Sequence, residues 1–125
     1  MARSDRLLRQ IRDRLEPDES VLNSVIGLVG EGDADGLKTI SMFATTDKRL
    51  VLLTKRMVGY ELEGFAYAGV SSFEMREGIR GHELSFLASG NRVRMTRIAQ
   101  GDVAAFTATV CELGPGEEAS TTPLG

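Results

Sequence analysis

The strongest constraint on the fold is a series of seven short β-rich segments between residues 21 and 96. They are rich in Val, Leu, Ile, Phe and Thr, and the stretches between them contain the Gly, Asn, Asp and Ser residues that favour turns. Short strands that recur about every ten residues favour an antiparallel meander that curls into a barrel or a sandwich. The segments are residues 21–29, 39–45, 49–54, 60–65, 72–76, 83–87 and 92–96.

A short amphipathic helix is predicted before the first strand. Ser4 or Asp5 would cap it, and Pro17 would end it. Five arginines occupy its other faces. The helix can therefore cover a core of its own chain, or of a second copy, while its arginines stay in water. The apolar stripe consists of Leu7, Leu8, Ile11 and Leu15.

A second helix is predicted after the last strand. Asp102 would cap it, and the Gly-Pro-Gly sequence at residues 114–116 would end it. Its apolar stripe, Val103, Phe106, Val110 and Leu113, would cover an open end or seam of the sheet. We therefore expect an N-terminal helix over residues 1–17, a barrel with its capping helix over 18–113, and a flexible tail over 114–125.

Composition indicates one soluble domain. The chain has 125 residues, of which 42% are hydrophobic and 26% charged, close to globular averages. The single cysteine, Cys111, cannot form a bridge within the chain. The sequence has no apolar run long enough to cross a membrane, and its first residues lack a hydrophobic signal core. We expect a cytoplasmic protein.

The formal charge of −3 conceals alternating blocks. Five arginines against two aspartates make residues 1–15 basic, whereas residues 16–37 carry six acids and no base. Such alternation leaves no uniform basic face to follow a phosphate backbone. With two Tyr, five Phe and no Trp, the chain also lacks an aromatic platform for stacking bases. Nucleic-acid binding is therefore excluded from our expectations.

The residues that could carry chemistry do not form a known catalytic or metal-binding motif. Glu31, Asp33 and Asp35 imitate the start of a calcium-binding loop, but position twelve of that loop is Met42 instead of a glutamate. The only histidine, His82, follows a glycine at a predicted turn, and Cys111 lies beside the apolar stripe of the final helix. We therefore expect no enzyme activity, no cofactor and no metal, and we interpret the acidic segment as a solvated hairpin loop.

The basic residues of the predicted strands fall into two groups. Arg92 and Arg94 alternate with apolar residues, so we expect them on the outer face of the sheet, paired with glutamates such as Glu83. A second group flanks the third predicted strand and is a candidate patch for an anion or an acidic partner. That patch consists of Lys48, Arg49, Lys55 and Arg56.

The sequence resembles the bacterial pleckstrin-homology-like domains, in particular the YokE-like group. The resemblance is carried by Thr-Asp-Lys-Arg-Leu at residues 46–50, by Phe-Ala-Tyr at 65–67, and by the Ser-Gly-Asn turn at 89–91. It covers about residues 18–113 and implies a seven-stranded, strongly bent antiparallel barrel capped by the C-terminal helix. The fold class is therefore expected to be mainly β with α.

The resemblance implies an interaction module. Lipid-binding relatives hold phosphoinositides with Lys and Arg between the first two strands, where this chain has Glu31, Asp33 and Asp35. Because these acids would repel phosphates, a phosphoinositide site is not expected. We expect self-association, with the stripe from Leu7 to Leu15 at a subunit contact. The alternative is a peripheral binder of an anionic membrane or an anionic ligand through the Lys/Arg patch.

Overall fold

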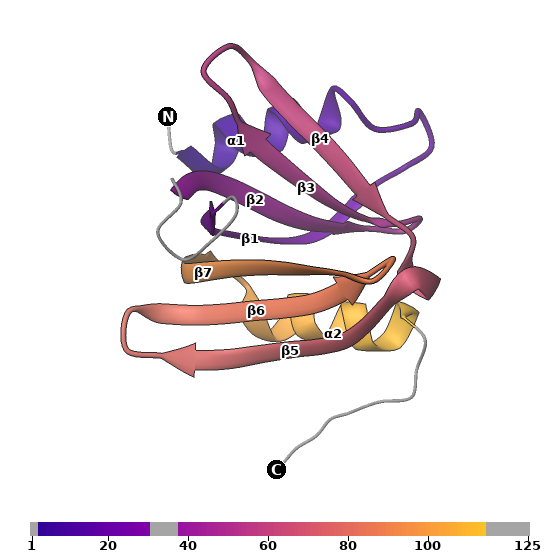
Figure 1. Cartoon of the computed structure of the whole chain (residues 1–125). Coiled ribbons are helices and arrows are strands. Elements are labelled where there is room, and N and C mark those ends of the chain that lie inside the picture. The colour runs from indigo at the N-terminus through magenta and orange to yellow at the C-terminus, as the bar shows by residue number, and fades with distance from the viewer. Residues whose placement is uncertain (1–2, 31–37, 115–125) are drawn as a thin grey trace.

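The computed structural model describes residues 3–30 and 38–114 (Figure 1). Seven antiparallel strands and two α-helices confirm the predicted architecture. The elements are α1 (Arg3–Arg12), β1 (Val21–Gly30), β2 (Lys38–Thr46), β3 (Leu50–Lys55), β4 (Tyr60–Phe65), the 3-10 helix η1 (Tyr67–Gly69), β5 (Val70–Gly78), β6 (Gly81–Ala88), β7 (Asn91–Gly101) and α2 (Val103–Leu113). The acidic segment from Glu31 to Asp35 and residues 115–125 of the expected tail lie outside the described residues.

The strands form one bent sheet in the order β4-β3-β2-β1-β7-β6-β5. The bend depends on β7, which pairs with β6 through its first part and with β1 through its last part. The two pairings overlap between Thr96 and Ile98, and Arg97, with a positive φ of 56°, lies where both registers shift. At the end of β7, Gly101 has a φ of 111° and packs directly on the backbone of Ser24. A side chain at this glycine would both strain the backbone and collide with β1.

Two apolar clusters hold the fold together. The inner cluster lies inside the bend of the sheet and is closed by α2, which packs on β1, β2 and η1. Its centre is Phe43, whose ring contacts Phe65, Phe86 and Phe106 at centroid separations of 5.7–6.4 Å. Asp102 caps α2 as predicted, since its Oδ1 accepts the backbone N–H of Ala105 at 3.0 Å.

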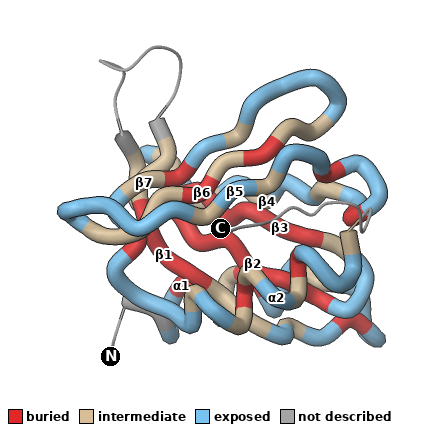
Figure 2. The backbone as a smooth tube through the Cα atoms, turned by 90° about the horizontal axis from the view of Figure 1, so that it is seen from below, coloured by how far each residue is buried: buried red, intermediate tan, exposed pale blue. Residues whose placement is uncertain are grey.

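The outer cluster lies between α1 and the opposite face of β1–β4. It consists of Leu7, Ile11, Ile26, Met42, Ala44, Val51 and Leu53, with Leu8 and Leu15 packed against it. Because α1 covers one face and the inner cluster the other, residues Leu50 to Thr54 of β3 are all buried. The buried residues follow β1, β2 and β3 through the molecule (Figure 2).

Three local expectations are corrected by the structure. The first helix begins at Arg3, so Ser4 and Asp5 lie in its first turn instead of preceding it. Leu113 is 40% exposed at the end of α2, so it does not complete the predicted buried stripe. Cys111 is exposed as well, so it is not part of the buried stripe that contains Phe106 and Val110.

Candidate functional site

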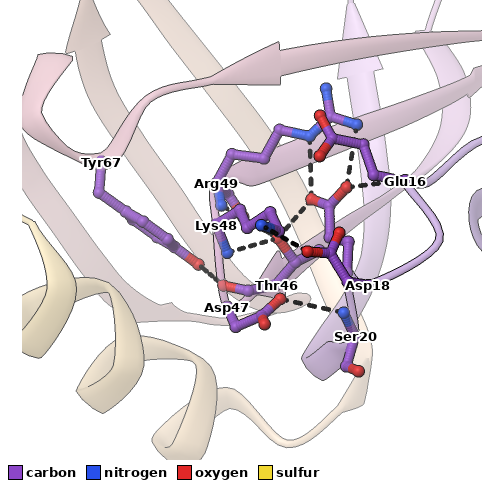
Figure 3. A network of polar contacts seen from close by, with 9 residues as sticks. Glu16, Asp18, Ser20, Thr46, Asp47, Lys48, Arg49 and Tyr67 are labelled. Atoms are coloured by element: carbon purple, nitrogen blue, oxygen red, sulfur yellow. Dashed lines mark hydrogen bonds and ion pairs between the residues drawn. The ribbon is translucent and has the colours of Figure 1, made fainter.

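The Thr46–Arg49 turn between β2 and β3 is held by a dense polar network (Figure 3). The Thr46 hydroxyl donates to Glu19 Oε2 at 2.7 Å and accepts the backbone N–H groups of Lys48 and Arg49 at 3.1 and 3.0 Å. A threonine at the start of a turn commonly makes such bonds to the backbone two and three residues on. The side chain of Thr46 therefore fixes the turn and links it to the segment before β1.

Glu19 and Arg49 form a two-point ion pair beside this turn. Arg49 Nε lies 3.0 Å from Glu19 Oε2, and its Nη2 lies 3.3 Å from Oε1. The Glu19 side chain is fully buried, whereas that of Arg49 is 30% exposed. Burial alone raises the pKa of Glu19, but hydrogen bonds from Arg49, Thr46 and the Glu16 backbone outweigh burial and lower the pKa below 4.5. Glu19 is therefore held as a carboxylate.

The other groups around the turn are also paired within the chain. The Tyr67 hydroxyl donates to the Thr46 carbonyl at 2.6 Å. Burial of the phenol raises the pKa of Tyr67 to about 12. Lys48 lies 3.3 Å from Asp18 in an exposed pair, and Asp47 accepts the backbone N–H of Ser20 at 3.0 Å. This network anchors the linker after α1 to the sheet and leaves little basic charge for a ligand.

The structure does not bring the four residues of the predicted basic patch together. Lys48 and Arg49 precede β3, whereas Lys55 ends it and Arg56 follows, so the two pairs are separated by the length of the strand, about 20 Å. Acidic partners occupy three of the four: Asp18 for Lys48, Glu19 for Arg49, and Glu61 for Arg56 at 2.6 Å.

The predicted apolar stripe lies on the chain's own sheet. Leu7 and Ile11 are buried in the outer cluster, and Leu8 and Leu15 pack against it. Sequence reasoning left open whether this stripe covers its own chain or a second copy. In the structure Leu7 and Ile11 are inaccessible to a second copy while α1 stays docked.

The opposite face of α1 presents arginines to solvent. Arg6, Arg9 and Arg12 are exposed, and none of them forms an ion pair with a described residue. Arg14, just after the helix, binds only uncharged groups: it donates to Gln10 Oε1 at 2.7 Å and its guanidinium lies 5.9 Å from the centre of the Tyr60 ring. We call Arg6, Arg9 and Arg12 the arginine face.

Two hairpin tips carry large apolar residues that sequence reasoning did not single out. Met57 and Val58 at the β3–β4 tip are 101% and 91% exposed, and Ile79 at the β5–β6 tip is 104% exposed. Their position in the sequence could have identified them. They lie next to Gly59 and Gly78 in expected turns, where polar residues are usual.

A charged groove of about 230 Å³ lies on the outer face of β5–β7. As expected from the alternation of the strand, Arg94 faces outward and pairs with Glu83, at 3.5 Å. The residues that line the groove are Glu74, Arg76, Glu83, Leu84, Ser85, Arg92 and Arg94. Three arginines against two glutamates give this groove a net charge of only +1. The exposed residues from Asp5 to Arg14 sum to +2, with Arg6, Arg9, Arg12 and Arg14 against Asp5 and Asp13.

The remaining candidates form no site within residues 3–30 and 38–114. His82 is half-buried in β6 opposite Glu77, and no group of three or more potential metal-binding side chains occurs in these ranges. Neither helix of the described chain is long and apolar enough to cross a membrane.

Comparison with known proteins places the whole barrel in one family. A family model described as a bacterial PH domain matches residues 15–112. No curated protein matches the chain. The match begins after α1 ends at Arg12, so the arginine face lies outside the part that the family model describes.

Proposed function

Because the chain belongs to the bacterial PH domain family, we propose that it is a non-enzymatic interaction module that binds an anionic partner through the arginine face. Domains with this fold generally serve as non-catalytic binding modules. A binding module needs an exposed surface that its own chain does not cover. In the described chain, α1 supplies one, because Leu7, Leu8 and Ile11 pack on the sheet whereas the side chains of the arginine face are exposed.

The carrying observation is that three arginines without an acidic partner among the described residues lie together on one helix. In the barrel, the exposed arginines that form no ion pair with a described residue are spread over β5, β7 and the β5–β6 turn: Arg76, Arg80, Arg92 and Arg97. Arg49, Arg56 and Arg94 each have a glutamate partner that neutralises them. Arg6, Arg9 and Arg12 have none among the described residues, and they project from one rigid helix. Asp5 and Asp13 are exposed on the same segment, but Arg14 adds a fourth exposed arginine, so the segment keeps a net positive charge. Such an excess raises the local concentration of an oppositely charged partner.

Three finer assignments belong to this proposal. We place the chain in the YokE-like group on the sequence of residues 46–54, and we place its action in the cytoplasm, where a lone thiol such as Cys111 stays reduced. Self-association through Leu7, Leu8, Ile11 and Leu15 stays a prediction. It would require α1 to leave its own sheet and cover the same face of a second copy. Light scattering on the whole chain measures whether the chain self-associates at all.

Retention on immobilised heparin tests the arginine face without assuming which anionic partner it meets. We expect the double variant Arg6→Gln/Arg9→Gln to elute at clearly lower salt than the unmodified chain, because two exposed charges of the face are lost. Glutamine is a good helix former, so α1 should persist.

The matched control is Arg76→Gln/Arg92→Gln, which removes two exposed arginines from the outer face of β5–β7. The net charge changes equally in both variants. The control should elute close to the unmodified chain. Equal shifts for the two variants would mean that heparin senses net charge alone, and the assignment of α1 would be wrong.

A further inference from the structure

The bent sheet has two edge strands, β4 and β5, because the strand order begins with one and ends with the other. From Glu74 to Gly78, β5 pairs in regular register with β6 on one side. On its other side β5 has no strand partner in the described chain, and it lies at the rim of the sheet (Figure 1). The N–H and C=O groups along such an edge are a template for pairing with a further strand.

The two edges differ in the charges that they carry. On β4 the exposed charged residues, Glu61 and Glu63, have the same sign, which is a common protection of an edge. On β5, Glu74 and Arg76 have opposite signs, are exposed and line the outer face. Neither forms an ion pair with a described residue, because Glu83, which lies opposite Arg76 in β6, pairs with Arg94 instead.

The order of the charges on β5 selects one register for pairing with a second copy of β5. In an antiparallel pair about a two-fold axis through Met75, Glu74 of each copy lies opposite Arg76 of the other. Two pairs of opposite charge result, and such cross-strand pairs stabilise a sheet. An axis through Glu74 or Arg76 would place two like charges opposite each other. An axis through Leu62 of β4 would place Glu61 opposite Glu63, so that edge disfavours the same arrangement.

We propose that two copies of the chain associate through their β5 edges, antiparallel and centred on Met75, so that the sheet continues from one copy into the other. The inference goes beyond the proposed function and does not depend on the arginine face. Phe73 and Met75 are only partly buried on the inner face, and the pairing would cover more of both side chains.

This mode of association leaves α1 in place. The helix packs on β1–β4, so the pairing of β5 needs no release of the stripe from Leu7 to Leu15. A stable interface takes about 800 Å² from each partner, which is more than one short strand provides. We therefore expect a dimer that forms at high concentration and dissociates on dilution.

Sedimentation velocity of the whole chain, from about 1 μM to about 1 mM, measures the association. The mass should rise from that of one chain to that of two. Glu74→Arg or Arg76→Glu alone should raise the dimer Kd by about tenfold or more, because both attractive pairs become repulsive. Both side chains are exposed, so neither change removes a buried contact. The control, Glu63→Arg on β4, changes the net charge as Glu74→Arg does and should dimerise like the unmodified chain.

Mixing the two single variants tests the register itself. In an equimolar mixture of Glu74→Arg and Arg76→Glu, the two basic residues of one copy would face the two acidic residues of the other, so the dimer should return. A mixture that stays monomeric would overturn the proposal, as would an unmodified chain that is monomeric at about 1 mM. Dimerisation that ignores both reversals would assign it to another surface, such as the stripe from Leu7 to Leu15, and would also overturn it.

The arginine face is tested separately from this pairing. Heparin retention is measured on dilute chain, at concentrations where the sedimentation experiment finds a monomer. Loss of the dimer in Glu74→Arg then leaves the prediction for Arg6→Gln/Arg9→Gln unaffected, and a failure of the heparin prediction leaves the β5 pairing unaffected.

Discussion

Replacing Ile11 by alanine should lower the free energy of unfolding by about 2–5 kcal/mol, the usual cost of removing a large aliphatic side chain from a packed core. Ile11 is fully buried between α1 and the outer face of the sheet. The loss would be a large part of the stability of a small domain, typically about 5–15 kcal/mol. Urea denaturation measures this loss, because the midpoint concentration multiplied by the slope of the transition gives the free energy of unfolding.

The same substitution at Ile79 provides the control. Ile79 is completely exposed at the β5–β6 tip, so Ile79→Ala should change stability by no more than about 0.5 kcal/mol. The comparison distinguishes two roles for the stripe of α1. If Ile11→Ala were as mild as Ile79→Ala, α1 would not be packed on its own sheet, and its leucines would be available to a second copy.

Replacing Glu19 by glutamine should cost about 2–4 kcal/mol, because it breaks a buried ion pair and leaves the Arg49 guanidinium with a poorer partner. We place the cost below that of a fully buried pair because Arg49 is 30% exposed and water can reach it. The control is Asp18→Asn at the neighbouring pair with Lys48, whose side chains are 74% and 40% exposed. That change should cost much less than Glu19→Gln, because water and salt screen an exposed pair.

Glu19 should also account for part of the acid sensitivity of the fold. The pKa of Glu19 is lower in the folded chain than its ordinary value of 4.5. The resulting stabilisation is present above pH 4.5 and is lost as the pH falls through the lower pKa of the folded state. In Glu19→Gln the stability should therefore decline less steeply below pH 4.5. If the free energy of unfolding of Glu19→Gln fell below pH 4.5 as steeply as that of the unmodified chain, the Glu19 carboxylate would not be stabilised by Arg49 and Thr46.

The architecture was predictable because its determinants are local. Turn residues such as those at 89–91 separate the strands, and Asp102 at the start of α2 acts on its own backbone. The length of β7 was not predictable, because its pairing with β6 ends at Ile98 and its last residues, up to Gly101, are held by β1 alone. A local pattern cannot show an exchange of partners between distant strands.

The candidate site was predicted less well because it depends on distant pairings. Arg49 is matched by Glu19, thirty residues earlier, and no spacing rule connects them. The stripe containing Ile11 was equally consistent with packing on its own chain and on a second copy, since amphipathicity does not identify the surface that is covered. The arginine face could be identified as an exposed surface only from the structure, which shows that the other side of α1 is buried.

The central claim is that this PH-like module binds an anionic surface with a face that its own folding leaves free. Sedimentation of the unmodified chain with vesicles, at low and at moderate salt, tests that claim most directly. We predict that the chain pellets with anionic vesicles at low salt, is partly released at moderate salt, and stays in solution with vesicles of zwitterionic lipid. A chain that remains in the supernatant with anionic vesicles even at low salt would contradict the claim.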